Sequence, residues 1–419
     1  MSAEARALAR CAELATLSSR PDALERVHLT PEHARANALV ADWMQEAGLR
    51  PWQDGAGNQC GRREGRTPGL PALLLGSHLD TVPDAGRYDG PLGVVMALAV
   101  VERLRDTAGL PFALEVVGFG DEEGARFGTA LLGSRALAGT WDDAWWALRD
   151  RDGTTLAQAF RDFGLDPDRV GGAARRPEEL VGYLEAHIEQ GPHLEAADAS
   201  LGYVTTIAGA RRFHLTVLGE ARHAGGTPYS RRRDALVGAS EVVTAIERLA
   251  RATGDHGCIA TVGRLEVSPG AVNVVPGRVD LTLDLRAAND AVRDAMWERM
   301  QAAAVGLCTD RGLRLEVVET HSAPAAPCAP WLQRAVVDGI RSTGQPSPPG
   351  LWSRAGHDAM ALAAVTDVGM LFLRCHDGIS HHPAEDVREI DVARGIAALE
   401  QAVLAVARDV DARAAGGAA

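Results

Sequence analysis

PALLLGSHLDTVPDAGRYDGPLG, residues 71–93, opens with a run of apolar residues that predicts a short buried strand. His78 and Asp80 follow at the carboxyl end of this strand, and Asp89 lies on a loop rich in Gly, Pro and Asp that leads into another apolar segment. Ligand sites in open α/β sheets lie outside the carboxyl ends of the strands. The stretch therefore suits a metal site at the edge of a parallel sheet, although His78 and Asp80 could equally be hydrogen-bonded residues of a turn.

Three further segments, at residues 112–118, 183–195 and 368–374, are also interpreted as strands that end in polar side chains. The first precedes a run of adjacent carboxylates, which are either solvated or hold something positive. The second carries an imidazole before a Gly-Pro turn, and the third precedes a His-His pair. Together the strand ends supply His78, Asp89, Glu122, Glu123, His187 and His381.

This set of side chains suits two divalent ions such as zinc or manganese, with cobalt or nickel as further options, because it combines imidazoles with carboxylates and lacks thiolates. Two neighbouring ions need a shared ligand, and Asp89 is our candidate because a carboxylate has two oxygens. Asp80 is placed to accept the other N–H of the His78 imidazole and so fix its tautomer. One of the two glutamates at 122 and 123 would bind metal, while its neighbour would move a proton from water to the leaving nitrogen.

Composition narrows the function further. The 419 residues favour two domains, and a formal charge of −13 argues against a nucleic-acid or membrane-surface partner, since both need a basic face. All 43 basic residues are arginines, so Schiff-base chemistry, a P-loop lysine, a Ser-Lys dyad and a carbamylated-lysine metal bridge are excluded.

The cysteines and apolar segments bear on localisation. The six cysteines are scattered and contain no CxxC, which indicates reduced thiols in a cytoplasmic protein. The N-terminus lacks the continuous apolar core of a secretory signal, and no apolar run is long enough to span a bilayer.

The middle of the chain changes pattern from about residue 211. Alternating apolar residues predict strands and longer periodic segments predict helices, in the order βαββαβ of a split βαβ domain. The expected elements are strands at about 211–217, 259–267, 279–286 and 313–318, with helices at 235–252 and 290–306. Residues 323–330 form a Pro-rich linker, and the tail from residue 411 should be frayed.

We therefore expect an α/β protein. A catalytic domain with a mixed, mainly parallel sheet would be formed by residues 1–209 and 323–419, and a ferredoxin-like split βαβ domain would be inserted at residues 210–322. A cleft between two domains is a common substrate site, so we expect the substrate there.

Seven motifs in order along nearly the whole chain resemble the M20-type metallohydrolases. More narrowly, they are similar to the hydantoinase/carbamoylase branch, which contains N-carbamoyl-L-amino-acid hydrolases, β-ureidopropionase and allantoate amidohydrolase. The motifs are HLDTVPDAGRYDG (78–90), DEEGARFG (121–128), HIEQGPHLE (187–195), HAGGTPYSRRRDA (223–235), NVVPGRVDLTLDLR (273–286), AGHDA (355–359) and GISHHPAE (378–385).

The resemblance implies a role for each ligand. His78, Asp89 and His187 would hold one metal, and Asp89, Glu123 and His381 the other, with Glu122 as the general base. The presence of histidine rather than a carboxylate at position 187 resembles this branch more than the M20 peptidases. His381 is preferred over His382 because the family's ligand directly follows the serine.

Substrate contacts are expected from His223, Asn273 and Arg286, because an arginine fork can hold a carboxylate and a histidine and an amide can donate to an oxyanion. Gln190 and the backbone near Gly356 should line the same pocket. In similar proteins the inserted domain acts as a lid and makes a homodimer contact, so His223 would serve its own site or that of a partner subunit.

The function implied is hydrolysis of the linear carbamoyl amide of a small ureido acid, releasing ammonia and carbon dioxide. The opening Arg211-Arg212-Phe213 favours allantoate, while Arg354 and Arg374 depart from the family pattern and could recharge the pocket. The alternatives are an N-carbamoyl-L-amino-acid hydrolase or β-ureidopropionase and, more distantly, an M20 peptidase or aminoacylase. A serine or thiol hydrolase lacks a GxSxG motif, and the complete ligand set argues against a non-catalytic binding protein.

Overall fold

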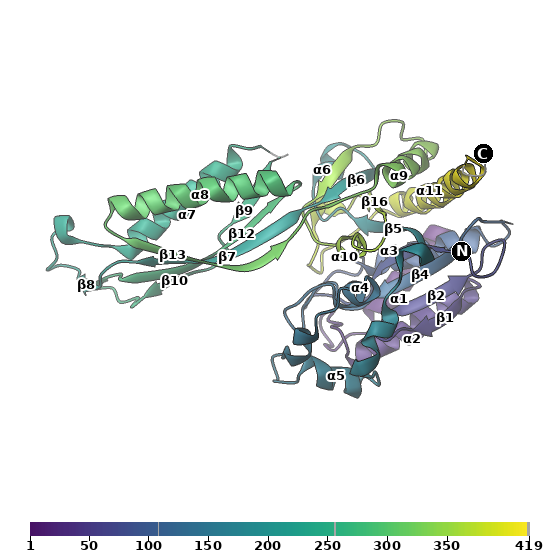
Figure 1. The fold of residues 1–419 in the computed structure, drawn as a ribbon, viewed down its shortest axis with the longest axis horizontal. Helices are drawn as coiled ribbons and strands as arrows, with labels where there is room; N and C mark the ends of the chain where they lie inside the picture. Colours follow the sequence, from purple (N-terminus) through teal and green to yellow (C-terminus); the bar gives the residue numbers. More distant parts are fainter. Residues whose placement is uncertain (108, 255–256, 417–419) are drawn as a thin grey trace. The chain divides into compact units, whose positions relative to one another are not determined.

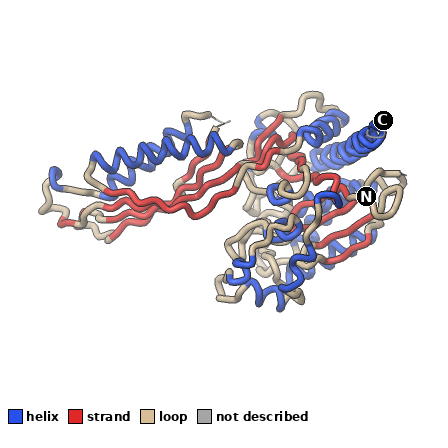
Figure 2. The backbone as a smooth tube through the Cα atoms, viewed as in Figure 1, coloured by secondary structure: helices blue, strands red, loops and turns tan. Residues whose placement is uncertain are grey.

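The computed structural model describes residues 1–107, 109–254 and 257–416. The chain divides into two compact units. The large unit contains Met1–Thr205, Pro327–Leu351 and Gly356–Ala419, and the small unit contains Thr206–Ala326 and Trp352–Ala355. Figure 1 labels the elements, and Figure 2 shows them by secondary structure.

The large unit is built on a mixed sheet with the strand order β1-β2-β4-β3-β5-β16-β6-β14, and β15 pairs with β6. The four central strands, β4, β3, β5 and β16, run parallel, whereas the pairs towards β1 and β6 are antiparallel. The mixed α/β fold expected from the sequence is therefore confirmed. The strands are β1 (Arg50–Gln53), β2 (Gln59–Arg63), β3 (Ala72–His78), β4 (Ala113–Phe119), β5 (Leu180–Ile188), β6 (Leu201–Ile207), β14 (Ala326–Pro327), β15 (Gly350–Ser353) and β16 (Val368–Leu373).

Helix α3 forms the centre of the core of the large unit. It packs on β3, β4 and β5 and is covered in turn by α1 and α11, so all its residues from 91 to 101 are buried. This double cover explains why its sequence is apolar on every face. The helices of the unit are α1 (Ala3–Ala15), α2 (Pro31–Glu46), α3 (Pro91–Arg103), α4 (Leu132–Leu137), α5 (Leu156–Asp162), α6 (His193–Ala196), α9 (Pro330–Ser342), α10 (Asp358–Leu362) and α11 (Glu389–Gly416).

The small unit has an antiparallel sheet with the order β10-β12-β7-β13, and β9 also pairs with β12. Helices α7 and α8 pack on one face of it (Figure 1), where alternate strand residues such as Leu215 and Leu283 are buried. This is the order of a split βαβ domain. The elements are β7 (Gly209–Leu218), β8 (Arg222–His223), α7 (Ala235–Arg251), β9 (Cys258–Thr261), β10 (Leu265–Ser268), β11 (Val274–Val275), β12 (Arg278–Ala287), α8 (Asp290–Asp310) and β13 (Arg314–Ala323).

Short 3-10 turns complete the described elements. They lie at Asp143–Ala147, Pro167–Ala173, Pro177–Glu179, Tyr229–Arg231 and His376–Gly378. Within the described ranges, no helix combines the length and apolar character that crossing a membrane requires.

Three sequence-based boundaries were wrong. The strand expected at 259–267 is two strands, β9 and β10, because the chain breaks at residues 262–264, where the carbonyl of Arg264 accepts from the N–H of Thr282 at 3.1 Å. The expected linker at 323–330 contains the end of β13 and the edge strand β14. Helix α11 continues through most of the tail expected to fray, and residues 417–419 lie outside the described part.

Candidate metal centre and active site

The candidate ligands come together at one edge of the central sheet of the large unit. His78 is the last residue of β3, Glu122 and Glu123 follow β4, His187 lies next to the end of β5, and the His381 loop follows β16. These four strands are adjacent and parallel, so their carboxyl ends share one edge. The structure thus brings these strand-end residues together at one edge, as the sequence analysis expected.

The remaining candidate ligand, Asp89, lies just before α3 and is held against His78 by the local backbone. Gly90, between Asp89 and the first residue of α3, has a φ of +83°, and a Cβ at this position would lie 2.4 Å from the His78 ring. A side chain at residue 90 would therefore push the imidazole and the carboxylate apart.

The two carboxylate oxygens of Asp89 face different histidines. Its Oδ1 lies 3.1 Å from Nε2 of His187 and 3.5 Å from Nε2 of His78. Its Oδ2 lies 3.2 Å from Nε2 of His381, which is also 3.3 Å from Oε1 of Glu123. Each oxygen therefore belongs to a separate cluster of potential ligand atoms, as a bridging carboxylate requires.

Four groups among the described residues bring potential ligand atoms within 4.8 Å of one another. Two of them match the sets implied by the resemblance, and the other two extend the same site. The groups are His78–Asp89–His187, Asp89–Glu123–His381, His78–Glu122–Glu123 and Glu185–His187–His357.

The hydrogen bonds of the imidazoles test whether these groups fit a cation. Nδ1 of His78 lies 3.0 Å from the carbonyl of Asp80, and Nδ1 of His187 lies 2.9 Å from the carbonyl of Ile188. Carbonyls only accept, so Nδ1 carries the hydrogen and each Nε2 presents a lone pair towards Asp89. Among the described residues, Nε2 of His187 is buried without a hydrogen-bond partner. Acceptors that converge in this way fit a divalent cation.

Asp80 acts differently from our expectation. Its carboxylate is 3.5 Å from Nδ1 of His78, farther than its own carbonyl oxygen. The carboxylate instead accepts the backbone N–H groups of Glu122 and Glu123 at 3.0 and 3.1 Å. Asp80 thus fixes the His78 ring through its backbone and the glutamate pair through its side chain.

The neighbouring side chains shift the pKa of Asp89 and that of His381 in opposite directions. Burial raises the pKa of the Asp89 carboxyl, but the surrounding imidazoles of His187, His381 and His78 outweigh burial and hold this pKa well below its usual range. Hydrogen bonds to Asp89 and Glu123 raise the pKa of His381 to about 10. The site therefore attracts positive charge strongly.

Glu122 has the environment of a proton-transfer group. Burial raises the pKa of its carboxyl well above the usual value, partly opposed by His78, whose Nε2 lies 4.0 Å from Oε2 of Glu122. The preceding Asp121 is fully buried and has a φ of +64°, and this turn presents the next two backbone N–H groups to Asp80. A carboxyl with a raised pKa beside the ligand cluster can accept and return a proton.

Comparison with known proteins identifies the family. The model of peptidase family M20/M25/M40 matches residues 74–405. The chain belongs to the M20 family. It is 41% identical to an N-carbamoyl-L-amino acid amidohydrolase of Geobacillus stearothermophilus, over 95% of this chain and 97% of that protein. It is 38% identical to an allantoate deiminase of Arabidopsis thaliana, over 94% of this chain and 81% of that protein.

Among solved structures, an amidase of the hydantoinase/carbamoylase family from Burkholderia multivorans is similar to this M20 protein with a TM-score of 0.89. The two are 34% identical over 96% of this chain and 98% of that one. The resemblance inferred from the motifs is therefore confirmed, and the protein is a hydrolase of carbon–nitrogen bonds.

Gln190 and Gly356, expected to line the pocket of this M20 hydrolase, both lie in the large unit. Nε2 of Gln190 donates to Oδ2 of Asp89 at 2.7 Å and lies 3.4 Å from Nε2 of His381, so this side chain is part of the ligand cluster. Gly356 precedes His357, whose ring packs edge-on against His187 with centroids 4.5 Å apart.

The other expected substrate residues lie in the small unit and form two separate groups. His223 pairs with Val274 in the β8–β11 ladder, and the carbonyl of Asn273 accepts the N–H of Ala224 at 2.9 Å. Arg286 lies near the far end of β12. Gly277 precedes β12, and its carbonyl accepts the N–H of Gly219, four residues before His223. From Gly277 to Arg286 the chain advances nine residues along the strand, which corresponds to about 30 Å. Figure 1 shows β8 beyond one end of the sheet of the small unit.

Arg286 is held in place by its neighbours. Its guanidinium donates to both oxygens of Asp284, at 2.8 and 3.2 Å, and to the carbonyl of Arg354 at 2.7 Å. The Arg354 side chain stacks over Trp352, 4.5 Å from the ring centroid. Arg286 is therefore pre-oriented, and Asp284 partly neutralises it.

Two arginines that entered the substrate expectation, Arg374 near the pocket and Arg211 in the opening of the insert, form ion pairs within the chain. Arg374 is buried and donates to both oxygens of Asp391 at 2.9 and 3.1 Å and to Asp198 at 3.0 Å. Arg211 pairs with Glu319 at 2.8 Å and with Asp294 at 3.2 Å. These partners, far away in sequence, satisfy both charges.

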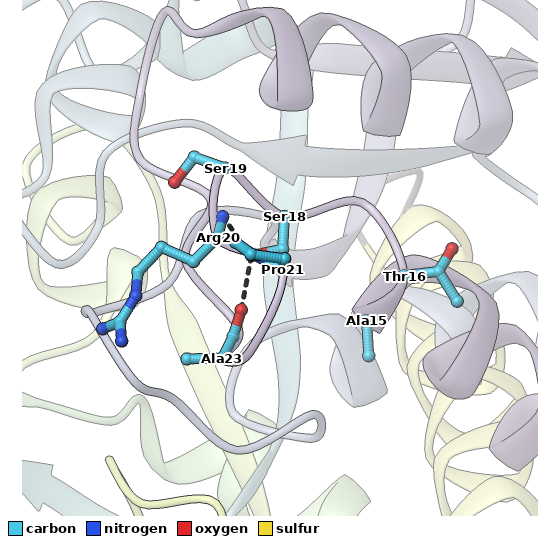
Figure 3. A pocket seen from close by; sticks show the side chains of 7 residues that line it. All are labelled: Ala15, Thr16, Ser18, Ser19, Arg20, Pro21 and Ala23. Atoms are coloured by element: carbon cyan, nitrogen blue, oxygen red, sulfur yellow. Dashed lines mark hydrogen bonds between the residues drawn. The ribbon is translucent and has the colours of Figure 1, made fainter.

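A hollow at the N-terminal end of the large unit offers no comparable chemistry. Figure 3 shows it beside a turn in which Ser18 Oγ donates to the carbonyl of Ala23 at 2.6 Å. None of the candidate ligands lines it. Its lining consists of Ala15, Thr16, Ser18, Ser19, Arg20, Pro21 and Ala23.

Sequence reasoning missed Asp121, Glu185, His357 and Glu385. Ser77 Oγ donates to Glu185 Oε1 at 2.8 Å, and the carboxylate of Glu385 accepts the N–H of Tyr88 at 2.7 Å. Asp121, His357 and Glu385 occur within the family-like motifs, and Glu185 lies two residues before one of them, which is the signal that could have singled them out.

Proposed function

We propose that this M20 hydrolase is a binuclear-metal amidohydrolase that cleaves the ureido group of a small ureido acid. The observation that carries the proposal is the position of Asp89, with one oxygen towards His78 and His187 and the other towards His381. Zinc or manganese suits these imidazole and carboxylate ligands, with cobalt or nickel as further options.

The reaction converts R–NH–CO–NH₂ and water into R–NH₂, carbon dioxide and ammonia. Divalent ions would polarise the substrate carbonyl and make water more acidic. Glu122 takes a proton from the attacking water and returns it to the leaving nitrogen. The backbone bonds of Asp80 to residues 122 and 123 hold Glu122 in position for both transfers.

The acid group of the substrate would bind Arg286, whose planar fork suits a carboxylate. N-carbamoyl-L-amino acids and allantoate are the leading candidates, because relatives with these names are 41% and 38% identical to the chain. Extra arginines near the pocket would have favoured allantoate, but Arg211 and Arg374 form ion pairs with aspartate and glutamate side chains of the same chain. Their charges therefore give allantoate less support. β-Ureidopropionate and peptide substrates are the alternatives.

We also propose that the protein works as a homodimer through the small unit. The strand path from Gly277 to Arg286 is about 30 Å long and β8, which carries His223, lies beyond its Gly277 end (Figure 1), so one small substrate cannot reach both His223 and Arg286 of one chain. If both residues serve the same substrate molecule, one of them comes from a second copy of the chain. The six free cysteines are all buried, which supports a reducing compartment such as the cytoplasm.

The experiment that tests the function is a substrate panel. Metal-reconstituted protein is incubated with N-carbamoyl-L-amino acids, allantoate, β-ureidopropionate, acylated amino acids and dipeptides, and ammonia release and peptide cleavage are measured. The proposal requires ammonia from at least one ureido acid at a much higher kcat/KM than for any peptide or acyl substrate. Preferential cleavage of peptides or acyl amides would contradict it.

A further inference from the structure

Glu385 links the two loops that carry Asp89 and His381. Its Oε1 accepts the backbone N–H of Tyr88 at 2.7 Å and that of Asp89 at 3.1 Å. Its Oε2 accepts the hydroxyl of Ser380 at 2.9 Å. One carboxylate therefore holds the backbone of the central ligand and the residue next to His381, although nearly 300 residues separate the two loops.

The same residues converge on the outer oxygen of Asp89. Ser380 Oγ also lies within hydrogen-bond distance of Oδ2 of Asp89, the oxygen that faces His381, so its single hydrogen is shared between this oxygen and Glu385. His381 itself has a φ of +56°, a conformation that a residue with a side chain adopts only when its surroundings hold it. The bonds of Ser380 to Glu385 and Asp89 supply such a constraint beside it.

The packing around Glu385 is also specific. Its side chain is 4% exposed, and a Cβ added at Gly86 would lie 2.3 Å from its carboxyl carbon and 2.4 Å from its own Cβ. Gly86 leaves the space through which Glu385 reaches the Asp89 loop. Glu385 belongs to none of the candidate ligand groups formed by the described residues, so it is not itself a candidate ligand.

From this geometry we propose that Glu385 is a positioning residue that sets the second metal position. The inference rests on the proposed binuclear function. Glu385 fixes Asp89 and, through Ser380, His381, which are two of the three ligands in the Asp89–Glu123–His381 group. Loss of Glu385 therefore weakens the second ion more than the ion held by His78, Asp89 and His187.

The test measures metal binding directly, with Mn²⁺ as the probe and electron paramagnetic resonance as the readout for free and bound ions. Metal-free wild type is compared with Glu385→Ala, Glu385→Gln and Gly86→Ala. Removing a group that orients metal ligands costs about 10- to 100-fold in metal affinity. We expect a loss of this size for the second ion in Glu385→Ala, and a smaller loss in Glu385→Gln, whose amide oxygen still accepts the two backbone N–H groups.

Gly86→Ala and a control variant, Asp391→Asn, separate positioning from general destabilisation. Gly86→Ala keeps the Glu385 carboxylate but displaces it, so this variant should also weaken binding of the second ion. If Glu385→Ala does not fold, Gly86→Ala alone tests whether Glu385 positions the ligands. Asp391→Asn removes a buried carboxylate bound to Arg374 and should leave both affinities unchanged.

The result that overturns the inference is a wild-type affinity for the second ion in Glu385→Ala or Gly86→Ala, or an equal loss in Asp391→Asn. A wild-type protein that binds fewer than two Mn²⁺ ions would instead contradict the proposed function, and the positioning role with it. The wild-type titration thus distinguishes the two failures.

Discussion

Asp89 and His187 face each other with Oδ1 and Nε2 3.1 Å apart, and both side chains are buried. Because Nδ1 of His187 is bound to the carbonyl of Ile188, this contact joins two groups that both offer lone pairs. Such a contact is stable only with positive charge between the two atoms, supplied by a proton or a metal ion. On the other oxygen of Asp89, Nε2 of His381 lies 3.2 Å from Oδ2.

The first prediction concerns the base. Glu122→Gln should retain both metal ions but lower kcat by at least about 100-fold, because an amide cannot accept the proton from water. Metal content and kcat for ureido-acid hydrolysis are measured together. The exposed Glu178→Gln is the matched control and should behave as wild type. Turnover near the wild-type level in Glu122→Gln would remove this residue as the base.

The second prediction concerns the substrate carboxylate. Arg286→Lys should raise KM for ureido acids about tenfold or more, because a point charge replaces a planar fork. The KM of a neutral carbamoyl amine should change little. Arg278→Lys is the control, since Arg278 pairs with Asp280 near the other end of the same strand. Equal KM values for Arg286→Lys and wild type would show that Arg286 does not bind the acid group.

The third prediction separates Arg374 from the pocket. Arg374→Met leaves the buried Asp391 without its partner and should lower the free energy of unfolding by about 3–5 kcal/mol. The KM for ureido acids should not change. Urea denaturation and steady-state kinetics test the two statements. A stable variant with an altered KM would restore the interpretation of Arg374 as a pocket residue.

The fourth prediction is a pH dependence of stability. Burial lowers the pKa of His33 from 6.5 to about 4. As pH falls below 6.5 the unfolded chain takes up a proton that the folded state excludes, so folding loses stability down to pH 4, by about 3 kcal/mol in total. His33→Gln should flatten the curve of unfolding free energy against pH in this interval, compared with wild type and with His214→Gln. Parallel curves would contradict the buried neutral state of His33.

The candidate site residues could be found in the sequence because their signal is local. His78, Glu122 and His187 each stand at or just after the end of an apolar segment, and parallel strands bring such ends to one edge. The split βαβ order could also be predicted, because the alternation in β12 and the periodicity of α7 are strong.

Residues defined by distant contacts could not be found in this way. The role of Glu385 depends on Tyr88 and Asp89, almost 300 residues earlier, and the charge of Arg374, just after β16, is satisfied by Asp391 in α11. Strands β1 and β2 are short and partly polar, so their sequences lack the apolar run that marked the central strands.

The central claim is that two ions share Asp89 and that both are needed for turnover. Its most direct test is a titration of metal-free protein with Mn²⁺ or Zn²⁺, in which bound metal and ureido-acid hydrolysis are followed together. The account predicts no activity without metal and a rise that is complete only when two ions are bound per chain. Full activity in protein with no bound divalent ion, or no further rise after the first ion, would contradict it.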